Sequence, residues 1–422
     1  MIGLSLGVSE DEIIPASDVK AKIEAGGPAD FDNCMIVGDL NLSALTFERP
    51  VHFNHTIFEN SVNFESTIFN AIAYFGFSKF NDDAKFDSSE FNNTADFGRS
   101  EFSNTAHFGS SRFNGTAYFG YSKFNGTAYF GSSKFNGIGY FGSSKFNDDA
   151  YFERSEFNNT AYFGSSKFND DANFDSSKFN SIAYFVATQF YREASFSDSQ
   201  FIGTAFFNRS EFNEDARFEG ADFNCKLYLK YAEYEKIYIK LSSIKELVYD
   251  DAVYLSLMEN FKKLGYLEEY DNCYYEYRKE RRDQSWSGKY RPMNPIEEEI
   301  RKCFDWGLEL FYGYGKKPLY PLGWSLFIIA IFGIFWRREG LGTREWPPDS
   351  PSKKGGLWRK ALIFSLTVFL SGTKFFIDPP NVPFLIGSSE SRIKIAFTAE
   401  RALGAFFSIL FFLAVGATVL RN

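Results

Sequence analysis

The chain has 422 residues, with 45 lysines and arginines against 54 aspartates and glutamates, and its formal net charge is −9 at pH 7. This length predicts two or three domains. The four cysteines form no C-x-x-C pair and none lies near a histidine in the sequence, so we expect reduced thiols in a cytosolic setting and neither a metal nor a redox site. The sequence contains no phosphate loop, nucleophile elbow or zinc motif, so we expect neither an enzyme nor a cofactor.

Residues 1–35 are predicted to hold a helix that caps the domain after it. The stretch SDVKAKIEA, Ser17 to Ala25, has Ser17 as a candidate N-cap and Gly26-Gly27 as a stop signal. The preceding residues, MIGLSLGVSEDEIIP, lack a positively charged start and turn acidic early, unlike a signal peptide. We therefore expect the N-terminal part of the protein to stay in the cytosol.

Phenylalanine then recurs in alternating steps of five and six residues from Phe53 to Phe223. The unit is therefore eleven residues long, as in TAYFGSSKFNG at 127–137. Eleven-residue repeats also occur in helical supercoils, but Gly, Asn, Ser and Thr recur in these units and are poor helix formers. Ala128-Tyr129-Phe130 alternates small, polar or aromatic, and large residues, and turn-prone Gly131 follows. The pattern predicts a β-solenoid of very short strands.

Residues 36–228 resemble the pentapeptide-repeat family in its Phe-rich variant. The resemblance implies a right-handed quadrilateral β-helix with two eleven-residue units per coil. About eight coils stacked about 4.8 Å apart would give a rod of roughly 40 Å. The two Phe of each unit and the small residue two positions before each of them are expected to face inward, and the residue before each Phe to face solvent.

The same periodicity predicts columns of like residues on the solenoid surface. Tyr118, Tyr140, Tyr162 and Tyr184 should align on one face, and Lys123, Lys145 and Lys167 on another. Such columns indicate either a docking surface for a cytosolic protein or decoration left by repeat duplication, with lysines that discourage edge pairing. Some soluble family members resemble a DNA duplex and bind topoisomerases, which remains an alternative.

Residues 229–316 are predicted to form a helical neck. Apolar residues recur at three- and four-residue spacing in 244–264, 266–283 and 294–312, and Gly265 separates the first two segments as a hairpin. The basic run RKERR, Arg278 to Arg282, indicates either a solvated helix face or a site for anionic lipid or nucleic acid.

The last part, residues 317–422, is predicted to be a transmembrane domain. Residues 319–336 (LYPLGWSLFIIAIFGIFW) carry no charge and are just long enough to span a bilayer. Aromatic residues and Lys316-Lys317 precede them as an interfacial belt. Residues 403–420 (LGAFFSILFFLAVGATVL) form a second predicted span, whose small residues allow close helix contact.

Between the two spans, FSLTVFLSGTKFF, Phe364 to Phe376, is apolar but carries hydroxyl groups. We expect a re-entrant helix over 361–374, since a helix that stops within a membrane needs protein or a water-filled cavity around it. A third span over 361–377 is the alternative.

The order of span, short hydroxyl-rich helix and span resembles the two-transmembrane pore domain of potassium-channel-like proteins. ALIFSLTVFLSGT resembles the pore helix, and Ala399 to Gly416 resembles the inner helix that lines the conduction path. The family's filter is a TVGYG-type strand, which does not follow the short helix here. Gly313-Tyr314-Gly315 precedes the first span, so we interpret it as an interfacial turn and expect no potassium filter.

The sequence thus predicts an oligomeric, multi-pass ion channel of the cell membrane, with the N-terminus and β-helix in the cytoplasm. The resemblance implies a homo-tetramer, although other rings are compatible with it, and leaves the permeating ion open. The expected partners are the lipid bilayer, other copies of the chain and a cytosolic protein on the β-helix, and no nucleic acid. A membrane-anchored scaffold without conduction is the alternative. The candidate pore-lining or filter residues are Thr367, Ser371, Gly372, Thr373, Lys374, Gly404, Ser408, Phe411 and Gly416.

Overall fold

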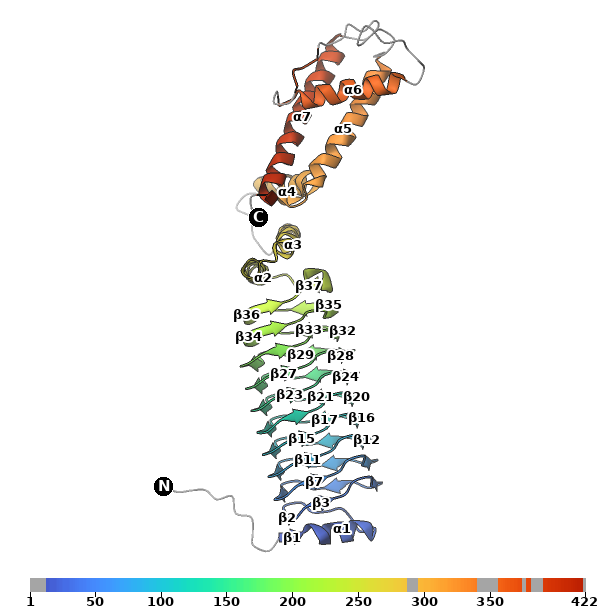
Figure 1. Cartoon of the computed structure of the whole chain (residues 1–422), viewed down its shortest axis with the longest axis vertical. Helices are drawn as coiled ribbons and strands as arrows, with labels where there is room; N and C mark the ends of the chain where they lie inside the picture. The colour runs from blue at the N-terminus through green and yellow to red at the C-terminus, as the bar shows by residue number, and fades with distance from the viewer. Residues whose placement is uncertain (1–12, 287–294, 340–355, 374–376, 381–389, 420–422) are drawn as a thin grey trace, which may run out of the picture. The chain divides into compact units, whose positions relative to one another are not determined.

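The computed structural model describes residues 13–286, 295–339, 356–373, 377–380 and 390–419 of the chain (Figure 1). The chain divides into two compact units, Met1–Tyr270 and Asp271–Asn422. The first unit is a parallel β-solenoid with helices at its ends, and the second unit is helical.

The solenoid is built from very short strands, as the repeat predicts. Every strand from β3 (Leu40–Asn41) to β33 (Ala205–Phe206) has two residues. Each coil contributes two strands to each of two parallel sheets, so that β12 (Glu90–Phe91) pairs with β16 (Arg112–Phe113), one coil later. Glu90 faces Arg112 and Phe91 faces Phe113, a register of 22 residues. The strands therefore form a four-sided coil of two eleven-residue units.

The solenoid is longer than the phenylalanine pattern predicts, with about 11 turns in place of about eight. At its start, β1 (Ile13–Pro15) pairs with β2 (Met35–Val37) before the Phe register begins. Near its end the strands lengthen, in β34 (Glu211–Arg217) and β35 (Asp222–Tyr228), and two more strands lie beyond residue 228 in the predicted helical neck: β36 (Glu233–Tyr238) and β37 (Ile244–Leu247). Phe212 pairs with Tyr234 at the 22-residue spacing, with Tyr in place of Phe, but the register then shifts and Asp215 pairs with Lys236, 21 residues later.

The solenoid core consists of stacked phenylalanine rings, as expected. Each Phe of the register from Phe53 to Phe207 is at most 1% exposed. Successive rings of a column lie nearly parallel: Phe97 and Phe119 have centroids 5.0 Å apart with an interplanar angle of 2°. The small residues predicted to face inward are buried as well, including Ala128 and Ser100. The alternation of large and small side chains fills the coil without overpacking.

Polar side chains join successive coils both inside and outside the core. Inside, the Ser100 hydroxyl donates to the Phe75 carbonyl oxygen at 2.6 Å, which satisfies a buried hydroxyl. Outside, an asparagine ladder runs along the surface, in which each amide donates to the asparagine one coil earlier at 2.6–2.8 Å. The ladder consists of Asn70, Asn92, Asn114, Asn136, Asn158 and Asn180.

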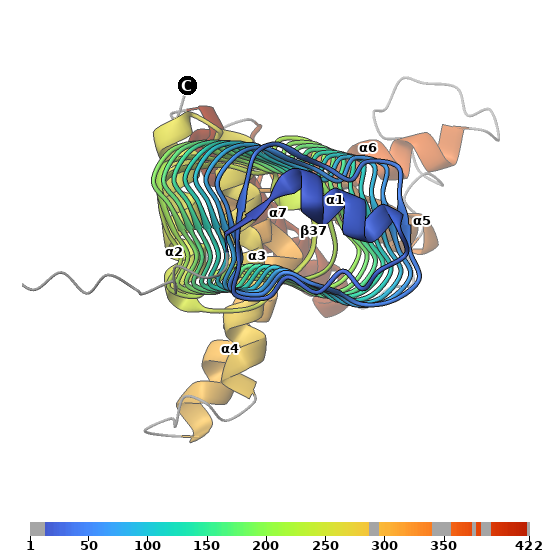
Figure 2. The same cartoon turned by 90° about the horizontal axis from the view of Figure 1, so that it is seen from below.

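Helix α1 (Ala16–Glu24) covers the first coil, as Figure 2 shows from below. Val19 of this helix is fully buried, so α1 closes the open end of the Phe stack. The predicted N-cap is wrong: Pro15 occupies that position without a side-chain cap, and Ser17 lies inside the helix with its hydroxyl on Asp18. The fixed backbone of proline suits it to the start of a helix.

Helix α2 (Asp251–Leu264) covers the last coil through Leu257, Phe261 and Asn260, all buried. The Asn260 amide donates to the Ile237 carbonyl oxygen at 2.8 Å, and its oxygen accepts the Ile237 N–H at 3.0 Å. The Asn260 side chain therefore pairs with backbone groups at the exposed edge of β36, where no further strand follows in that sheet among the described residues. Gly265 ends α2 with φ of 74°, which confirms the predicted hairpin break.

The second unit contains most of α3 (Leu267–Trp286), then α4 (Pro295–Tyr312), the short turn η2 (Gly313–Gly315), α5 (Leu319–Arg338), α6 (Gly356–Leu370) and α7 (Glu390–Val419). Two segments, Leu319–Arg338 and Ser391–Gly416, are long and apolar enough to cross a membrane. They match the two predicted spans, although α7 begins well before residue 403.

Candidate functional site

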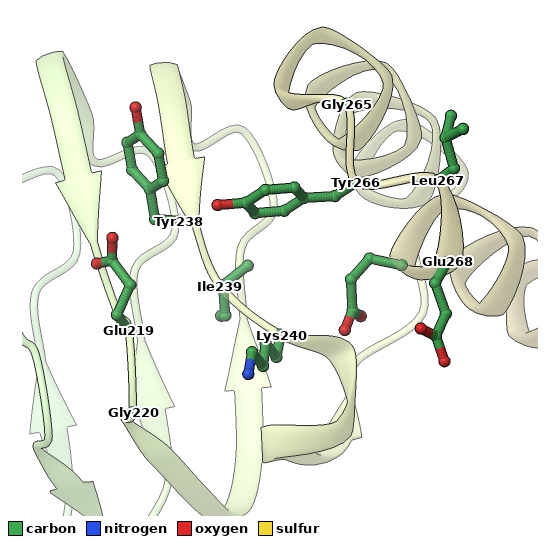
Figure 3. A pocket seen from close by; sticks show the side chains of 10 residues that line it. Glu219, Gly220, Tyr238, Ile239, Lys240, Gly265, Tyr266, Leu267 and Glu268 are labelled. Atoms are coloured by element: carbon green, nitrogen blue, oxygen red, sulfur yellow. The ribbon is translucent and has the colours of Figure 1, made fainter. Parts of the chain in front are cut away.

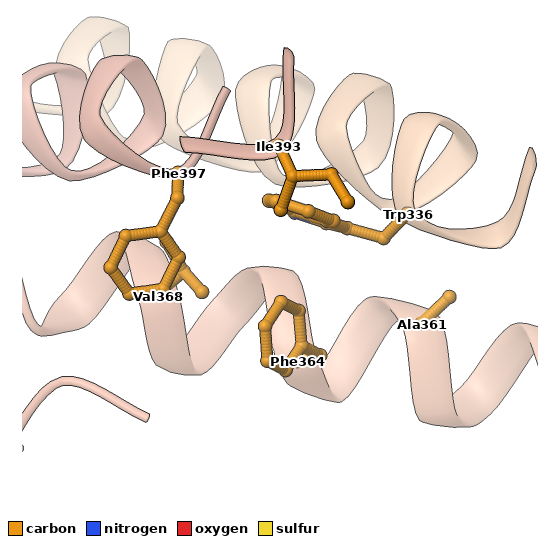
Figure 4. Close-up of a cluster of buried hydrophobic side chains, with 6 residues drawn as sticks. All are labelled: Trp336, Ala361, Phe364, Val368, Ile393 and Phe397. Carbon is orange, nitrogen blue, oxygen red and sulfur yellow. The ribbon is translucent and has the colours of Figure 1, made fainter. Parts of the chain in front are cut away.

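Helix α6 lies between α5 and α7 and packs on both of them (Figure 4). Its buried side chains Ala361, Phe364 and Val368 form one cluster with Trp336 of α5 and with α7. The Trp336 and Phe364 rings meet edge to face with centroids 5.1 Å apart. The α7 members of the cluster are Ile393 and Phe397. The short helix is therefore an integral part of the helical unit.

The end of α6 lies level with the middle of both long helices. Near its start, Ala361 belongs to the cluster around Trp336, at the end of α5. Near its end, Phe369 packs with Ile328 and with Phe407 of α7. Ile328 is the midpoint of α5, and eight residues separate it from Trp336, which is about 12 Å at about 1.5 Å per residue. Helix α6 thus passes alongside half of α5 and stops.

Two glycines allow α6 and α7 to touch backbone to backbone at this level. A Cβ atom on Gly404 of α7 would lie 2.0 Å from the Phe369 carbonyl oxygen. A Cβ on Gly372, just after α6, would lie 2.2 Å from the Arg401 carbonyl oxygen. No side chain fits at either position without moving a helix. Both glycines therefore serve the crossing of α6 and α7 within one chain.

The crossing brings together four of the predicted pore residues. Ser371, Gly372 and Thr373 lie directly after the end of α6, and Gly404 lies opposite them on α7. Ser371 is fully buried, and its hydroxyl donates to the Val368 carbonyl oxygen at 2.7 Å. Of the nine candidates, Ser371 and Gly404 are buried and Gly372 is half-buried, and all three fix the end of α6.

The other predicted pore residues do not join this contact. Thr367 is half-buried and donates within its own helix to the Ile363 carbonyl oxygen at 2.8 Å. Ser408 and Phe411 are half-buried on α7, and a Cβ on Gly416 would meet nothing within 4 Å. The remaining candidate, Lys374, lies outside the described residues.

A buried glutamate ties the three helices together. Glu400 of α7 is fully buried, and its carboxyl accepts the Trp336 indole N–H at 2.7 Å. The carboxyl also hydrogen-bonds the Ser365 hydroxyl of α6. Among the residues with described side chains, no lysine or arginine forms an ion pair with it. A buried carboxyl without a cation is costly unless it is neutral or fully hydrogen-bonded.

Every hydrogen bond in this cluster has a donor when the Glu400 carboxyl is protonated. The Ser365 hydroxyl also lies 2.8 Å from the Ile329 carbonyl oxygen of α5. A hydroxyl has one proton and donates one hydrogen bond. If that proton goes to Ile329, the acid form of Glu400 donates to Ser365 and accepts from Trp336, so every contact has a proton.

The sequence prediction did not include Trp336 and Glu400 in the site. Glu400 lies three residues before the predicted span at 403–420. A charged residue lowers the local hydropathy, so the predicted span began after it. Its position at the edge of an apolar run was the only available signal, since an ionisable group near a span marks a candidate functional position, and the neighbouring Arg392, Lys394 and Arg401 weaken that signal.

Two further polar atoms are buried at the end of α6. Thr373 Oγ1 and Arg401 Nε have no hydrogen-bond partner among the residues that the structure describes. Both residues adjoin the close contact at Gly372. Polar groups therefore gather at the level where α6 stops, although the surrounding helices are apolar.

The glycine-tyrosine-glycine sequence forms a turn, as predicted, and not a filter strand. All three residues of η2 have positive φ, 55° at Gly313, 51° at Tyr314 and 81° at Gly315. Burial raises the pKa of Tyr314 to about 12, against the opposing effect of nearby Arg282. The turn joins α4 to α5, before the first candidate span.

The predicted surface columns of the solenoid are confirmed. Rings of Tyr118, Tyr140, Tyr162 and Tyr184 stack with centroids 4.6–4.9 Å apart. Lys123, Lys145 and Lys167 stand in register on successive coils. Each tyrosine ring lies over a glycine of the preceding coil, because a Cβ on Gly120 would come within 2.6 Å of Tyr140.

A cavity of about 480 Å³ lies at the end of the solenoid, beside the turn between α2 and α3. Figure 3 shows Tyr266 reaching toward Tyr238, with Lys240 and Glu268 nearby. Glu269 also lines the cavity, and its carboxylate accepts the Leu241 N–H at 2.9 Å. This acid is thus used to attach α3 to the solenoid, so the cavity belongs to the C-terminal cap.

A family model for pentapeptide repeats (9 copies) matches residues 163–211 and 185–233 of the chain. No curated protein and no solved structure matches. The matched segment lies in the later coils, and the same 22-residue register extends to the earlier ones. The solenoid is therefore a pentapeptide-repeat structure. For the second unit, the comparisons add nothing to the two apolar helices.

Proposed function

We propose that this chain, whose solenoid consists of pentapeptide repeats, is the subunit of an oligomeric membrane pore. Helices α5 and α7 cross the bilayer, and α6 enters from one side and turns back. The solenoid then stands outside the membrane, on the cytosolic side. Copies of α7 and the end of α6 surround the conduction path.

The single observation that carries the proposal is the level at which α6 stops. A hydrocarbon core is about 30 Å thick, and α6 has 15 residues, or about 22 Å at about 1.5 Å per residue. Its end lies level with Ile328 and Gly404, the middles of the two candidate spans. A membrane anchor needs no such element, whereas a pore uses one to bring polar groups to mid-depth.

The polar groups at that level agree with this function. Ser371, Thr373 and Arg401 lie in or beside the turn that follows α6. The C-terminal end of a helix carries partial negative charge, which favours cations, whereas Arg401 favours anions. The permeating ion is therefore left open, and the missing TVGYG-type strand argues against a potassium filter.

The test combines conductance with water access. Full-length protein reconstituted in a planar bilayer should conduct, and single cysteines at Thr373 and Ser408 should react with a water-soluble maleimide. Ala414, fully buried within one chain, is the matched control on α7 and should stay unlabelled. If neither test cysteine reacts with the maleimide and the reconstituted protein does not conduct, the pore is refuted.

The second candidate function is a membrane-anchored scaffold. The observation that favours it is the continuous stack from Tyr118 to Tyr184 on the solenoid surface, which suits protein docking. In that case the maleimide leaves Thr373 and Ser408 unreacted, while the chain still fractionates with membranes.

A further inference from the structure

Helix α4 has one apolar face that continues beyond its contact with the candidate spans. At its C-terminal end, the Phe311 ring meets Trp324 of α5 and Phe407 of α7, with centroids 5.2 and 5.6 Å away. Residues seven and eleven positions earlier share that face of a helix. These are Phe304 and Ile300, which are 67% and 65% exposed. The apolar face therefore extends outward from the spans, and in the part of the chain that the structure describes Phe304 and Ile300 are left largely uncovered.

Helix α4 also lies across the direction of α5, as Figures 1 and 2 show from perpendicular views. The Trp324 indole N–H fixes this arrangement by donating to the Leu310 carbonyl oxygen at 2.9 Å. If α5 crosses a membrane, a helix held across it lies along the membrane surface. An amphipathic helix in that position buries its apolar face in the boundary between headgroups and acyl chains.

The opposite face of α4 is bound to α3 by ion pairs. Arg278 contacts Asp305 at 2.6 Å, and Arg282 pairs with Glu309. Burial alone would lower the pKa of Arg282, but the hydrogen bonds to Glu309 and Asp283 and the nearby charge of Glu309 together raise it above its usual value. These two ion pairs tie α4 to α3.

Between α3 and α4 lies a cavity of about 420 Å³ with an excess of positive charge. Beyond the two paired arginines, Arg281 and Arg301 line it and form no ion pair with a residue whose side chain the structure describes. Phe304 lines the same cavity, so an apolar side chain lies directly beside the cationic ones in the cavity wall.

We propose that this cavity binds the phosphate of an anionic phospholipid from the leaflet beside α4. The phosphate lies against Arg281 and Arg301, since guanidinium groups match phosphate oxygens in charge and geometry. The acyl chains follow Phe304 and Ile300 along the apolar face. The basic run Arg278–Arg282 then acts as a lipid site and not only as a solvated helix face. The inference relies on the membrane location in the proposed function, and not on conduction.

The first test measures lipid-dependent stability of the full chain in detergent. Phosphatidylglycerol should raise the unfolding temperature, and phosphatidylcholine or inorganic phosphate should not. The double variant Arg281→Gln/Arg301→Gln should lose this shift, with apparent lipid affinity about tenfold lower. The control Arg99→Gln/Arg209→Gln removes the same charge from exposed solenoid positions and should keep the shift.

Three outcomes of this test overturn the inference. Equal phosphatidylglycerol shifts in the wild type and in Arg281→Gln/Arg301→Gln would remove the site. An equal shift with inorganic phosphate would make it a free-anion site. Loss of the shift in the control variant as well would make the effect one of total charge.

A second measurement uses the exposed native Cys303 on α4, in a Cys225→Ser background. A bimane label there should be quenched by nitroxide lipids in a reconstituted bilayer. Absent quenching, or a disulfide between the Cys303 residues of two copies, would mean that lipid does not cover this face. If the chain fails to remain in membranes after an alkaline wash, the proposed function fails too. If it remains while the lipid tests fail, only this inference is lost.

Discussion

Replacement of Glu400 tests how the three helices are held together. In Glu400→Ala, the indole N–H of Trp336 loses its buried acceptor, and the hydroxyl of Ser365 keeps Ile329 but loses its hydrogen bond to Glu400. A buried polar group left unsatisfied costs about 1–3 kcal/mol, and the space left by the side chain adds to this. We expect Glu400→Ala to destabilise the helical unit by about 3–5 kcal/mol in total.

Glu400→Gln is the matched control, because an amide can donate to Ser365 and accept from Trp336 as the protonated acid does. It should cost less than about 1 kcal/mol. The assay heats the purified full chain in detergent and follows the loss of the intact assembly by size exclusion. Glu400→Ala should lower the midpoint by about 10 °C. Equal midpoints for the two variants would refute the hydrogen-bond account.

The other predictions concern packing and charge. Gly404→Ala should displace α6, because its Cβ would meet the Phe369 carbonyl oxygen, and should lower both stability and conductance, whereas Gly416→Ala, with open space around it, should change neither. Phe130→Ala should destabilise the solenoid by about 3–5 kcal/mol in urea unfolding, and a cost below about 1 kcal/mol would contradict the stacked core. Burial raises the pKa of Asp96, so the protonated acid favours the fold and its stabilisation falls as the pH rises through the folded pKa. Asp96→Asn should therefore raise the unfolding temperature at pH 7 and flatten its pH dependence, and an unchanged pH profile would refute this assignment.

The repeat made the solenoid core predictable from the sequence. Residues 22 positions apart occupy equivalent places, so the inward positions of Phe, Ala and Ser follow from the period alone. The ends were not predictable in this way. Phe gives way to Tyr234 and Ile244 in the last coils, and the cap by Asn260 depends on a contact with Ile237, 23 residues earlier in the chain.

The helical unit was predictable in its elements but not in its contacts. Hydropathy located both long helices and the short one between them. It could not find Glu400, whose partners Trp336 and Ser365 lie 64 and 35 residues away in the chain. It also assigned Gly372 and Gly404 to a pore lining, because small residues suit both a water-filled path and a close helix crossing, and the structure uses them for the crossing.

The most direct test of the pore concerns the two flanks of α6. Single cysteines at Trp358, in the first turn of α6, and at Asp378, after it, can be exposed to a membrane-impermeant maleimide on sealed cells that express the full chain with Cys303→Ser and Cys225→Ser. A helix that turns back at half depth leaves both positions on the same side, so both should react from that side only. Reaction of the two positions from opposite sides would show that the segment crosses the bilayer and would contradict the account.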